Sequence, residues 1–171
     1  MKITIITVSF NSVNTIEDTI MSVFSQDYND IEYIIVDGGS NDGTLDIVEK
    51  YKSKIRHIIS EPDKGIYDAM NKGISIASGD IIGILNSDDI YPEKDTISSV
   101  VSQFKKTKCQ SIYGDLQYVS NAEGFGQNSS MTTSNFGHDI HLSSDVMGVE
   151  VELNRFSVDN TYTTDSISGT K

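Results

Sequence analysis

Short runs of β-branched residues alternate with stretches of helical periodicity over the first 118 residues of this 171-residue chain. Runs such as the one at 3–8 are too short for helices and consist of isoleucine, valine and threonine, as buried strands do. The predicted strands lie at 3–8, 32–36, 56–60, 80–85 and 110–114. The apolar periodicity between them predicts amphipathic helices at about 13–24, 42–51, 65–77 and 97–104. This alternation predicts an α/β protein, a three-layer αβα sandwich around a mainly parallel, Rossmann-like sheet.

The sequence changes character after residue 118. Serine, threonine, asparagine, aspartate and glycine dominate 119–171, and no apolar period persists there for more than a few residues. Such a segment buries little apolar surface and hardly offsets the entropy that is lost when it becomes ordered. We therefore expect 1–118 to form the folded domain and 119–171 to form an irregular C-terminal tail. Within that tail, only 146–153 has the character of a strand.

The charge balance excludes some classes of partner. Thirteen basic residues against twenty-five acidic ones give a net charge of −12, whereas nucleic-acid-binding proteins usually present a basic face. The single cysteine, Cys109, can form neither an internal disulfide nor a thiolate metal cage. The apolar run at 3–8 is too short for a signal peptide or a membrane span. We expect a protein without a transmembrane segment, located in the cytoplasm or peripherally at the inner face of the membrane.

Polar loops follow four of the predicted strands, at 9–11, 37–43, 61–65 and 86–89. In an open parallel sheet, ligands bind beside the carboxyl ends of the strands, so these loops form the candidate site. Asp88 and Asp89 follow the strand at 80–85, and their adjacent carboxylates repel each other. Mg²⁺ or Mn²⁺ would relieve this repulsion and keep coordination positions open for a diphosphate. A solvated turn is the alternative interpretation, because Asn-Ser-Asp-Asp is also ordinary turn chemistry.

Two other loops carry candidate ligand-binding residues. Asp37 lies at the end of a predicted strand, where an acidic side chain suits a nucleoside, and Gly38 would let a flat base approach the backbone. Capping of the next helix explains the rest of that loop. Asp68 and Lys72 share one helical face, where they form a surface ion pair in the simplest interpretation. In the alternative, Asp68 faces a sugar, and Lys72 or Lys64 faces a phosphate.

Other motifs carry less information. His138 and His141 have a metal-binding spacing only within a helix, which the composition around them does not favour. The chain contains neither a Walker-type loop nor a G-x-G-x-x-G motif, so neither P-loop nor NAD binding is indicated.

Taken together, the motifs of the first 118 residues resemble the N-terminal, nucleotide-sugar-binding half of family 2 glycosyltransferases, which have the GT-A fold. They follow the order of that family without a break. The matching segments are TVSFN at 7–11, SVFSQ at 22–26, EYIIVDGGSNDGT at 32–44, EPDKGIYDAMNKGISIASGDIIGILNSDD at 61–89 and IYGD at 112–115.

The resemblance implies a nucleotide pocket formed by the first two loops. Val8, Ser9 and the loop through Asn11 would line the pocket, and Asp37 would help to hold the nucleoside. Many members carry a second aspartate that reads the uracil base, and Gly38 stands at that place in this chain.

The resemblance also implies a metal site and a donor-lining helix. Asp89 would ligate Mg²⁺ or Mn²⁺, and Asp88 would contact the ribose or the metal. Asn86 replaces the first acidic residue of the metal motif, which keeps an oxygen ligand but removes one charge. Asp68 and Lys72 fall on a segment that lines the donor site.

The second half of the family, which binds the acceptor and supplies the catalytic base, has no recognisable equivalent after Val119. Among the acidic residues there, the candidate bases are Glu123, Asp139, Asp145 and Asp159. None of them lies in a motif, so the catalytic base is left unassigned. The absence of this half would also leave apolar sheet surface uncovered, which predicts low stability or self-association.

The leading hypothesis is a metal-dependent, inverting transferase that uses a UDP-sugar in surface-polysaccharide assembly. Its acceptor would be a saccharide or a lipid-linked saccharide. A non-catalytic nucleotide-sugar-binding remnant of such an enzyme is the second hypothesis, motivated by the composition of 119–171. A nucleotidyltransferase is the third, although its usual glycine-rich, basic loop is absent after the first strand.

Overall fold

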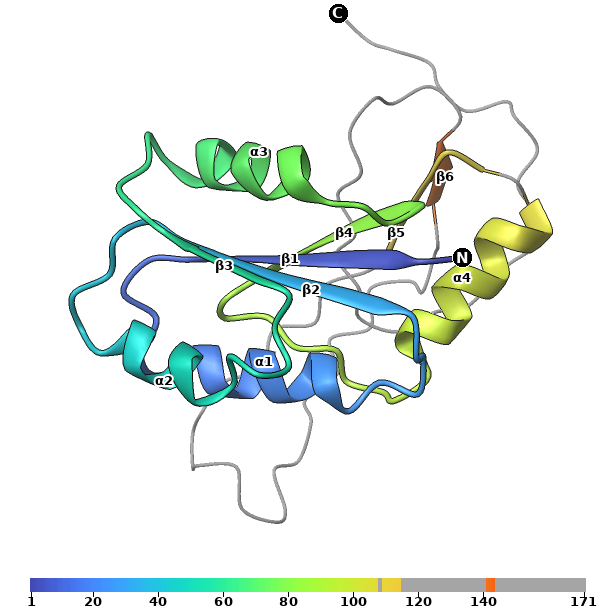
Figure 1. The fold of residues 1–171 in the computed structure, drawn as a ribbon. Helices are drawn as coiled ribbons and strands as arrows, with labels where there is room; N and C mark the ends of the chain where they lie inside the picture. Colours follow the sequence, from blue (N-terminus) through green and yellow to red (C-terminus); the bar gives the residue numbers. More distant parts are fainter. Residues whose placement is uncertain (108, 115–140, 144–171) are drawn as a thin grey trace, which may run out of the picture.

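The fold is built around a small parallel sheet in the computed structural model, which describes residues 1–107, 109–114 and 141–143 (Figure 1). Four parallel strands pair in the order β3-β2-β1-β4, and a separate two-stranded antiparallel sheet pairs β5 with β6. The elements in chain order are β1 (Ile3–Ser9), α1 (Ile16–Phe24), β2 (Ile31–Asp37), α2 (Thr44–Lys50), β3 (His57–Ser60), α3 (Ile66–Ile76), β4 (Ile81–Asn86), α4 (Thr96–Thr107), β5 (Ser111–Tyr113) and β6 (His141–Ser143).

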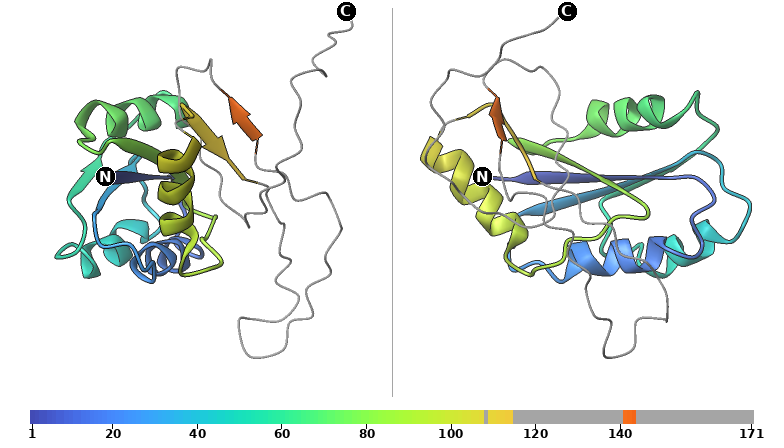
Figure 2. Two further views of the ribbon diagram at one scale, coloured as in Figure 1. Left: turned by 90° about the vertical axis from the view of Figure 1, so that its right-hand side faces the viewer. Right: turned by 180° about the vertical axis from the view of Figure 1, so that it is seen from behind.

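Helices cover both faces of the four-stranded sheet, which explains why its strands are apolar at nearly every position. Successive side chains of a strand point to opposite faces. Ile3 and Ile5 of β1 therefore join the apolar core that is shared with α1, α2 and α4, whereas Ile6 and Val8 join the core under α3. Figures 1 and 2 show α3 on one side of the sheet and α1 with α2 on the other. The three layers confirm the sandwich that the sequence predicts.

The strand register brings the polar loops together. Ser9, the last residue of β1, pairs with Asp37, the last residue of β2, and Asp37 pairs in turn with Ser60 at the end of β3. On the other side of β1, Val8 pairs with Asn86 at the end of β4. The loops that follow these strands therefore meet at one edge of the sheet, as expected for parallel strands.

Helix α3 packs closely on the sheet at Gly73, where a side chain would not fit. A Cβ atom added at Gly73 would lie 2.5 Å from Ile6 Cγ2 and 3.3 Å from Val36 Cγ2. A methyl group at this position would overlap the side chains of β1 and β2. The glycine thus sets the distance of α3 from the sheet, and with it the position of the loop that leads into α3.

The predicted strand at 110–114 differs from expectation in its partner. It forms β5, which pairs antiparallel with β6 and not with the four-stranded sheet; Ile112 lies opposite Leu142. Strand β6 lies within 119–171, where the sequence predicts a strand only at 146–153. Three residues are too few to show an alternating pattern, so β6 forms a strand because it pairs with β5, a distant segment of the chain. His141 is in this strand, not in a helix, and 146–153 and His138 lie outside the described residues.

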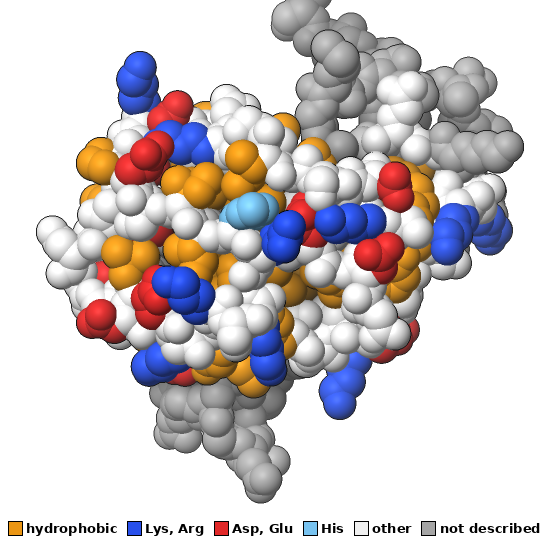
Figure 3. All heavy atoms as spheres, in the orientation of Figure 1, with side chains coloured by type: hydrophobic (Ala, Val, Ile, Leu, Met, Phe, Trp, Pro, Cys, Tyr) orange, Lys and Arg blue, Asp and Glu red, His pale blue; other side chains and the backbone are white. Residues whose placement is uncertain are grey.

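The surface carries mixed charge on the face shown in Figure 3. Basic and acidic side chains are interspersed there among apolar ones over the described part of the molecule. Within that same part of the chain, no helix is both long enough and apolar enough to cross a membrane.

Candidate functional site

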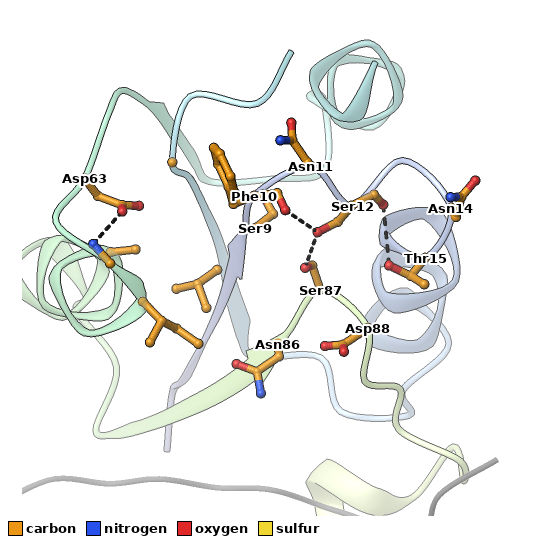
Figure 4. A pocket seen from close by; sticks show the side chains of 15 residues that line it. Ser9, Phe10, Asn11, Ser12, Asn14, Thr15, Asp63, Asn86, Ser87 and Asp88 are labelled. Atoms are coloured by element: carbon orange, nitrogen blue, oxygen red, sulfur yellow. Dashed lines mark hydrogen bonds between the residues drawn. The ribbon is translucent and has the colours of Figure 1, made fainter. Parts of the chain in front are cut away.

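A cleft of about 810 Å³ opens at the carboxyl ends of β1 and β4, between the loop that leads into α1 and the start of α3 (Figure 4). Six of the residues singled out in the sequence line it: Val8, Ser9, Asn11, Gly38, Asn86 and Asp88. Five others do not line it: Asp37, Lys64, Asp68, Lys72 and Asp89. The structure therefore brings most of the candidate residues to one place and assigns different surroundings to the rest.

The loop after β1 is fastened to its neighbours by hydrogen bonds. The hydroxyls of Ser12 and Ser87 lie 2.6 Å apart, and the Ser12 backbone N–H donates to Thr44 Oγ1 at 2.8 Å. Asn11 has a positive φ of 52° and accepts a hydrogen bond from the Asn41 backbone at 3.1 Å. Asparagine is among the few residues that tolerate this conformation. These bonds fix the wall of the cleft that begins at Ser9.

Asp37 is fully buried beneath this loop. Its Oδ1 accepts hydrogen bonds from the hydroxyls of Ser9 (3.2 Å) and Ser40. Its Oδ2 accepts from the backbone of Gly39 (3.0 Å) and Ser40 (2.9 Å) and from the hydroxyl of Ser60 (2.9 Å). Both oxygens are thus engaged by the ends of β1 and β3 and by their own loop. Asp37 joins the three strand ends beneath the cleft.

Asp68 and Lys72 of α3 hold the preceding loop. Lys72 Nζ forms an ion pair with Glu61 at 3.0 Å and donates to the carbonyl of Pro62 at 3.1 Å; it lies 3.6 Å from Asp68 Oδ2. The hydrogen bond to Glu61 raises the pKa of the Lys72 ammonium. Asp68 Oδ2 also accepts from the backbone N–H of Lys64 at 3.1 Å. The two side chains therefore fix the loop on both sides of residue 63.

The acidic loop after β4 presents one carboxylate to the cleft and holds the other behind it. Asp88 is exposed in the cleft, whereas Asp89 is half-buried and accepts a hydrogen bond from Asn86 Nδ2 at 3.1 Å. The pKa of the Asp89 carboxyl is raised overall. Burial raises it most, the hydrogen bond from Asn86 partly offsets this, and the charge of Asp88 raises it further. Asn86 Oδ1 is buried without a hydrogen-bond partner among the described residues.

An unpartnered buried oxygen beside two carboxylates is a donor set that suits a hard cation. Asn86, Asp88 and Asp89 thus fit Mg²⁺ or Mn²⁺ by ligand chemistry. They do not form a complete cage, because no cluster of three or more His, Cys, Asp or Glu side chains suited to a metal ion occurs in the described part of the chain.

Phe10 and Asp63 are among several cleft residues to which the sequence pattern assigns no individual role. Phe10 is 64% exposed although it is a large aromatic residue, and it lines the cleft beside Gly38. Asp63 lies across from it on the loop before α3. Their positions in polar loops at strand ends were the available signal, but only the folded structure shows that these loops face each other.

The comparison with family models identifies one family. The model described as "Glycosyl transferase family 2" matches residues 4–156, which extends past the segment that resembles the family by its motifs. An uncharacterized glycosyltransferase of Mycobacterium tuberculosis is 39% identical over 100 residues, which cover 58% of this chain and 38% of that protein. A PGL/p-HBAD biosynthesis glycosyltransferase of Mycobacterium bovis is 37% identical over 99 residues, 56% of this chain and 39% of that protein. The chain spans about two fifths of these relatives.

Solved structures share the fold. TarS 1-349 of S. aureus in complex with UDP-GlcNAc superposes with a TM-score of 0.62 at 26% identity, over 74% of this chain and 37% of that one. The mannosyltransferase PcManGT of Pyrobaculum calidifontis, in complex with GDP-Man and Mn²⁺, has a TM-score of 0.62 at 23% identity, over 68% and 36% of the two chains. These likenesses identify the sandwich as the GT-A fold. The family model, which matches most of the chain, establishes that the chain belongs to glycosyl transferase family 2.

Proposed function

We propose that this chain binds the nucleotide-sugar donor of a glycosyl transfer, with a UDP-sugar as the donor, in the cleft at the carboxyl ends of β1 and β4. The observation that carries the proposal is the position of the cleft, where the polar loops of a parallel α/β sheet meet. Its volume of about 810 Å³ lies within the range of small-molecule sites. The complex of TarS with UDP-GlcNAc supports a uridine nucleotide.

The acidic end of the cleft would hold the diphosphate with Mg²⁺ or Mn²⁺. Asp88, Asp89 and the free oxygen of Asn86 are the residues proposed to hold the cation. The hydrogen bond from Asn86 Nδ2 to Asp89 engages only the nitrogen of the amide, and Oδ1 has no hydrogen-bond partner among the described residues. In this arrangement Asp89 positions Asn86 as well as supplying charge.

The proposed reaction moves the sugar, with inversion at its anomeric carbon, to a saccharide or lipid-linked saccharide in surface-polysaccharide assembly. A divalent cation, when bound, supplies Lewis-acid stabilisation of the departing nucleoside diphosphate. The relative named for PGL/p-HBAD biosynthesis supports a biosynthetic role. The described residues do not include the four candidate bases (Glu123, Asp139, Asp145 and Asp159), so no catalytic base is assigned to the chain. The cytoplasmic or peripheral location and self-association stay predictions.

The proposal is tested by titrating UDP into the full chain and into two variants, Asp88→Asn and Asp89→Asn, in Mn²⁺. Each variant removes one charge from the acidic loop, and we expect at least tenfold weaker UDP binding in Mn²⁺ because charge-assisted contacts are worth about 1.5–3 kcal/mol. Asp95→Asn, an exposed site outside the cleft, is the matched control. Wild-type affinity in both loop variants would refute the metal assignment.

The relatives that the chain matches are named as glycosyltransferases, which does not favour the remnant hypothesis. The remnant hypothesis also makes a different prediction for turnover. A non-catalytic remnant would bind UDP in Mn²⁺ as the proposal predicts, yet release no sugar from a UDP-sugar when saccharide acceptors are present. Sugar transfer to any such acceptor excludes the remnant. Pyrophosphate formation from UTP and a sugar phosphate would instead indicate the nucleotidyltransferase.

A further inference from the structure

The end of the cleft away from the acidic loop is occupied by a second carboxylate. A Cβ atom added at Gly38 would lie only 2.6 Å from Asp63 Oδ2 and 3.4 Å from Phe10 Cδ2. The Asp63 carboxylate therefore fills the space that a side chain at residue 38 would take. Asp63 extends over the end of β2, from a loop that follows a different strand.

The two oxygens of Asp63 have different surroundings. Oδ1 accepts a hydrogen bond from the backbone N–H of Gly65 at 2.8 Å, which closes the turn that leads into α3. This turn accounts for Oδ1 only. No described residue donates a hydrogen bond to Oδ2, although Asp63 lines the cleft. In Figure 4 the Asp63 side chain points from its loop toward Phe10.

The position of this carboxylate is well fixed. Glu61 is tied to the sheet by a backbone hydrogen bond to the carbonyl of Asp37 at 3.0 Å. Lys72 bonds Pro62 on one side of Asp63, and Asp68 bonds Lys64 on the other. An acceptor held in this way is suited to select ligands by hydrogen bonding, because it is not free to turn away from an unsuitable one.

The surroundings of Oδ2 suit a flat heterocycle. The exposed ring of Phe10 offers a stacking surface, and Gly38 presents backbone without a side chain. Because the acidic loop lies at the other end of the cleft, a nucleotide whose diphosphate is bound there would place its base here. This step rests on the proposed function.

We propose that Asp63 Oδ2 recognises the base of the donor nucleotide and selects uracil over cytosine. Uracil carries an N3–H donor in the middle of its pairing edge, which a carboxylate oxygen accepts. Cytosine has an unprotonated, accepting N3 at the same position, which a carboxylate repels. Because Gly65 engages Oδ1, a single oxygen is left for the base, and this favours the single ring donor of uracil.

The test is a titration of UDP and of CDP into the full chain in Mn²⁺, compared with Asp63→Asn. The Gly65 N–H needs an acceptor, so the amide oxygen is expected at the place of Oδ1 and the amide NH₂ at the place of Oδ2. We expect UDP affinity to fall at least tenfold, and the UDP-to-CDP preference to narrow or reverse, because the NH₂ group can donate to N3 of cytosine. Asp46→Asn, an exposed carboxylate on α2, is the control and should change neither affinity.

A second pair of variants tests the same contact without relying on the amide. Gly38→Ala should displace Asp63 Oδ2 and lower UDP affinity severalfold, whereas the same change in an Asp63→Gly background should have little further effect. Circular dichroism and the thermal midpoint establish that each variant is folded. An unchanged UDP-to-CDP ratio in folded Asp63→Asn, or equal effects of Gly38→Ala in both backgrounds, would overturn the inference and leave the donor site standing. Failure of the wild-type chain to bind UDP would refute the proposed function and the inference with it.

Discussion

The hydroxyls of Ser12 and Ser87 lie 2.6 Å apart, although 75 residues separate them in the chain. One belongs to the loop after β1 and the other to the loop after β4, so their hydrogen bond spans the two walls of the cleft. Ser87 is further held through its carbonyl, which accepts from Thr19 Oγ1 at 3.0 Å. The cleft is thus braced by side chains and does not depend on loop backbone alone.

This relationship predicts coupled effects of substitution. Ser12→Ala and Ser87→Ala should each lower the free energy of unfolding by about 1 kcal/mol, the net value of a typical hydrogen bond. Once one hydroxyl is gone, removing the other should cost less, with a coupling energy of about 0.5–1.5 kcal/mol. Urea unfolding of the single and double variants measures this energy. Strict additivity would show that the two hydroxyls are not bonded in solution.

We predict that Asp37 affects the cleft indirectly, by stabilising the folded strand ends beneath it. Asp37→Asn replaces one acceptor oxygen by an NH₂ group, which cannot accept from the backbone and hydroxyl donors that surround it. We expect a loss of about 2–3 kcal/mol in the free energy of unfolding, because buried donors are left unpaired. Thermal or urea unfolding measures the loss, with Asp46→Asn as the exposed control. Loss of UDP binding with unchanged stability would instead indicate direct contact between Asp37 and the nucleoside.

The contact between Gly73 and the sheet predicts that replacing this helical glycine by alanine destabilises the fold, which is the opposite of the usual effect. Alanine normally stabilises a helix by about 1 kcal/mol relative to glycine, yet the overlap with Ile6 should outweigh this gain. We expect Gly73→Ala to lower the free energy of unfolding by about 1–3 kcal/mol. Ser75→Ala, an exposed position on the same helix, is the control and should be close to neutral. A stabilised Gly73→Ala variant would mean that α3 is less tightly packed than described.

We predict that Glu32 contributes to the loss of folding stability at low pH. It is buried and accepts hydrogen bonds from Lys2 Nζ (2.8 Å), Thr4 Oγ1 (2.6 Å) and Ser78 (2.8 Å to its backbone N–H). Burial raises its pKa, but these bonds outweigh burial and hold the pKa of the carboxyl far below its usual value of 4.5. The folded state therefore binds fewer protons than the unfolded state, so this contribution is full above pH 4.5 and is lost as the pH falls below it.

The measurement is the thermal midpoint between pH 7 and pH 3 for the wild type and Glu32→Gln. The variant should have a lower midpoint at pH 7 and a shallower decline in acid, because it has no charge to lose. Glu49→Gln, which breaks an exposed ion pair with Lys52, is the control and should follow the wild type. Parallel curves for Glu32→Gln and the wild type would contradict the assignment.

The fold could be predicted from the sequence where local pattern decides it. The four strands of the main sheet carry enough isoleucine and valine to be recognised, and helical periodicity located α1 to α4. Predicted and observed ends differ by only a few residues, as for the helix expected at 42–51 and found at Thr44–Lys50. β6 could not be predicted, because its three residues are defined by pairing with β5 and not by a pattern of their own.

The site was predictable as a set of loops but not as a set of contacts. That the loops meet follows from parallel strands. The burial of Asp37 depends on Ser9 and Ser60, and the place of Asp63 depends on Gly38; in each case the partners are far apart in sequence. The pair formed by Asp68 and Lys72 was foreseen, but not that Lys72 would bind Glu61 as well.

Calorimetric titration of UDP into the full wild-type chain, first with Mn²⁺ and then with EDTA, tests the central claim most directly. We predict micromolar binding in Mn²⁺ and a large loss of affinity in EDTA, because Asp88, Asp89 and Asn86 would hold a cation whose charge stabilises the bound diphosphate. Absence of binding in both conditions would contradict the account and mean that the cleft is not a nucleotide site in this chain.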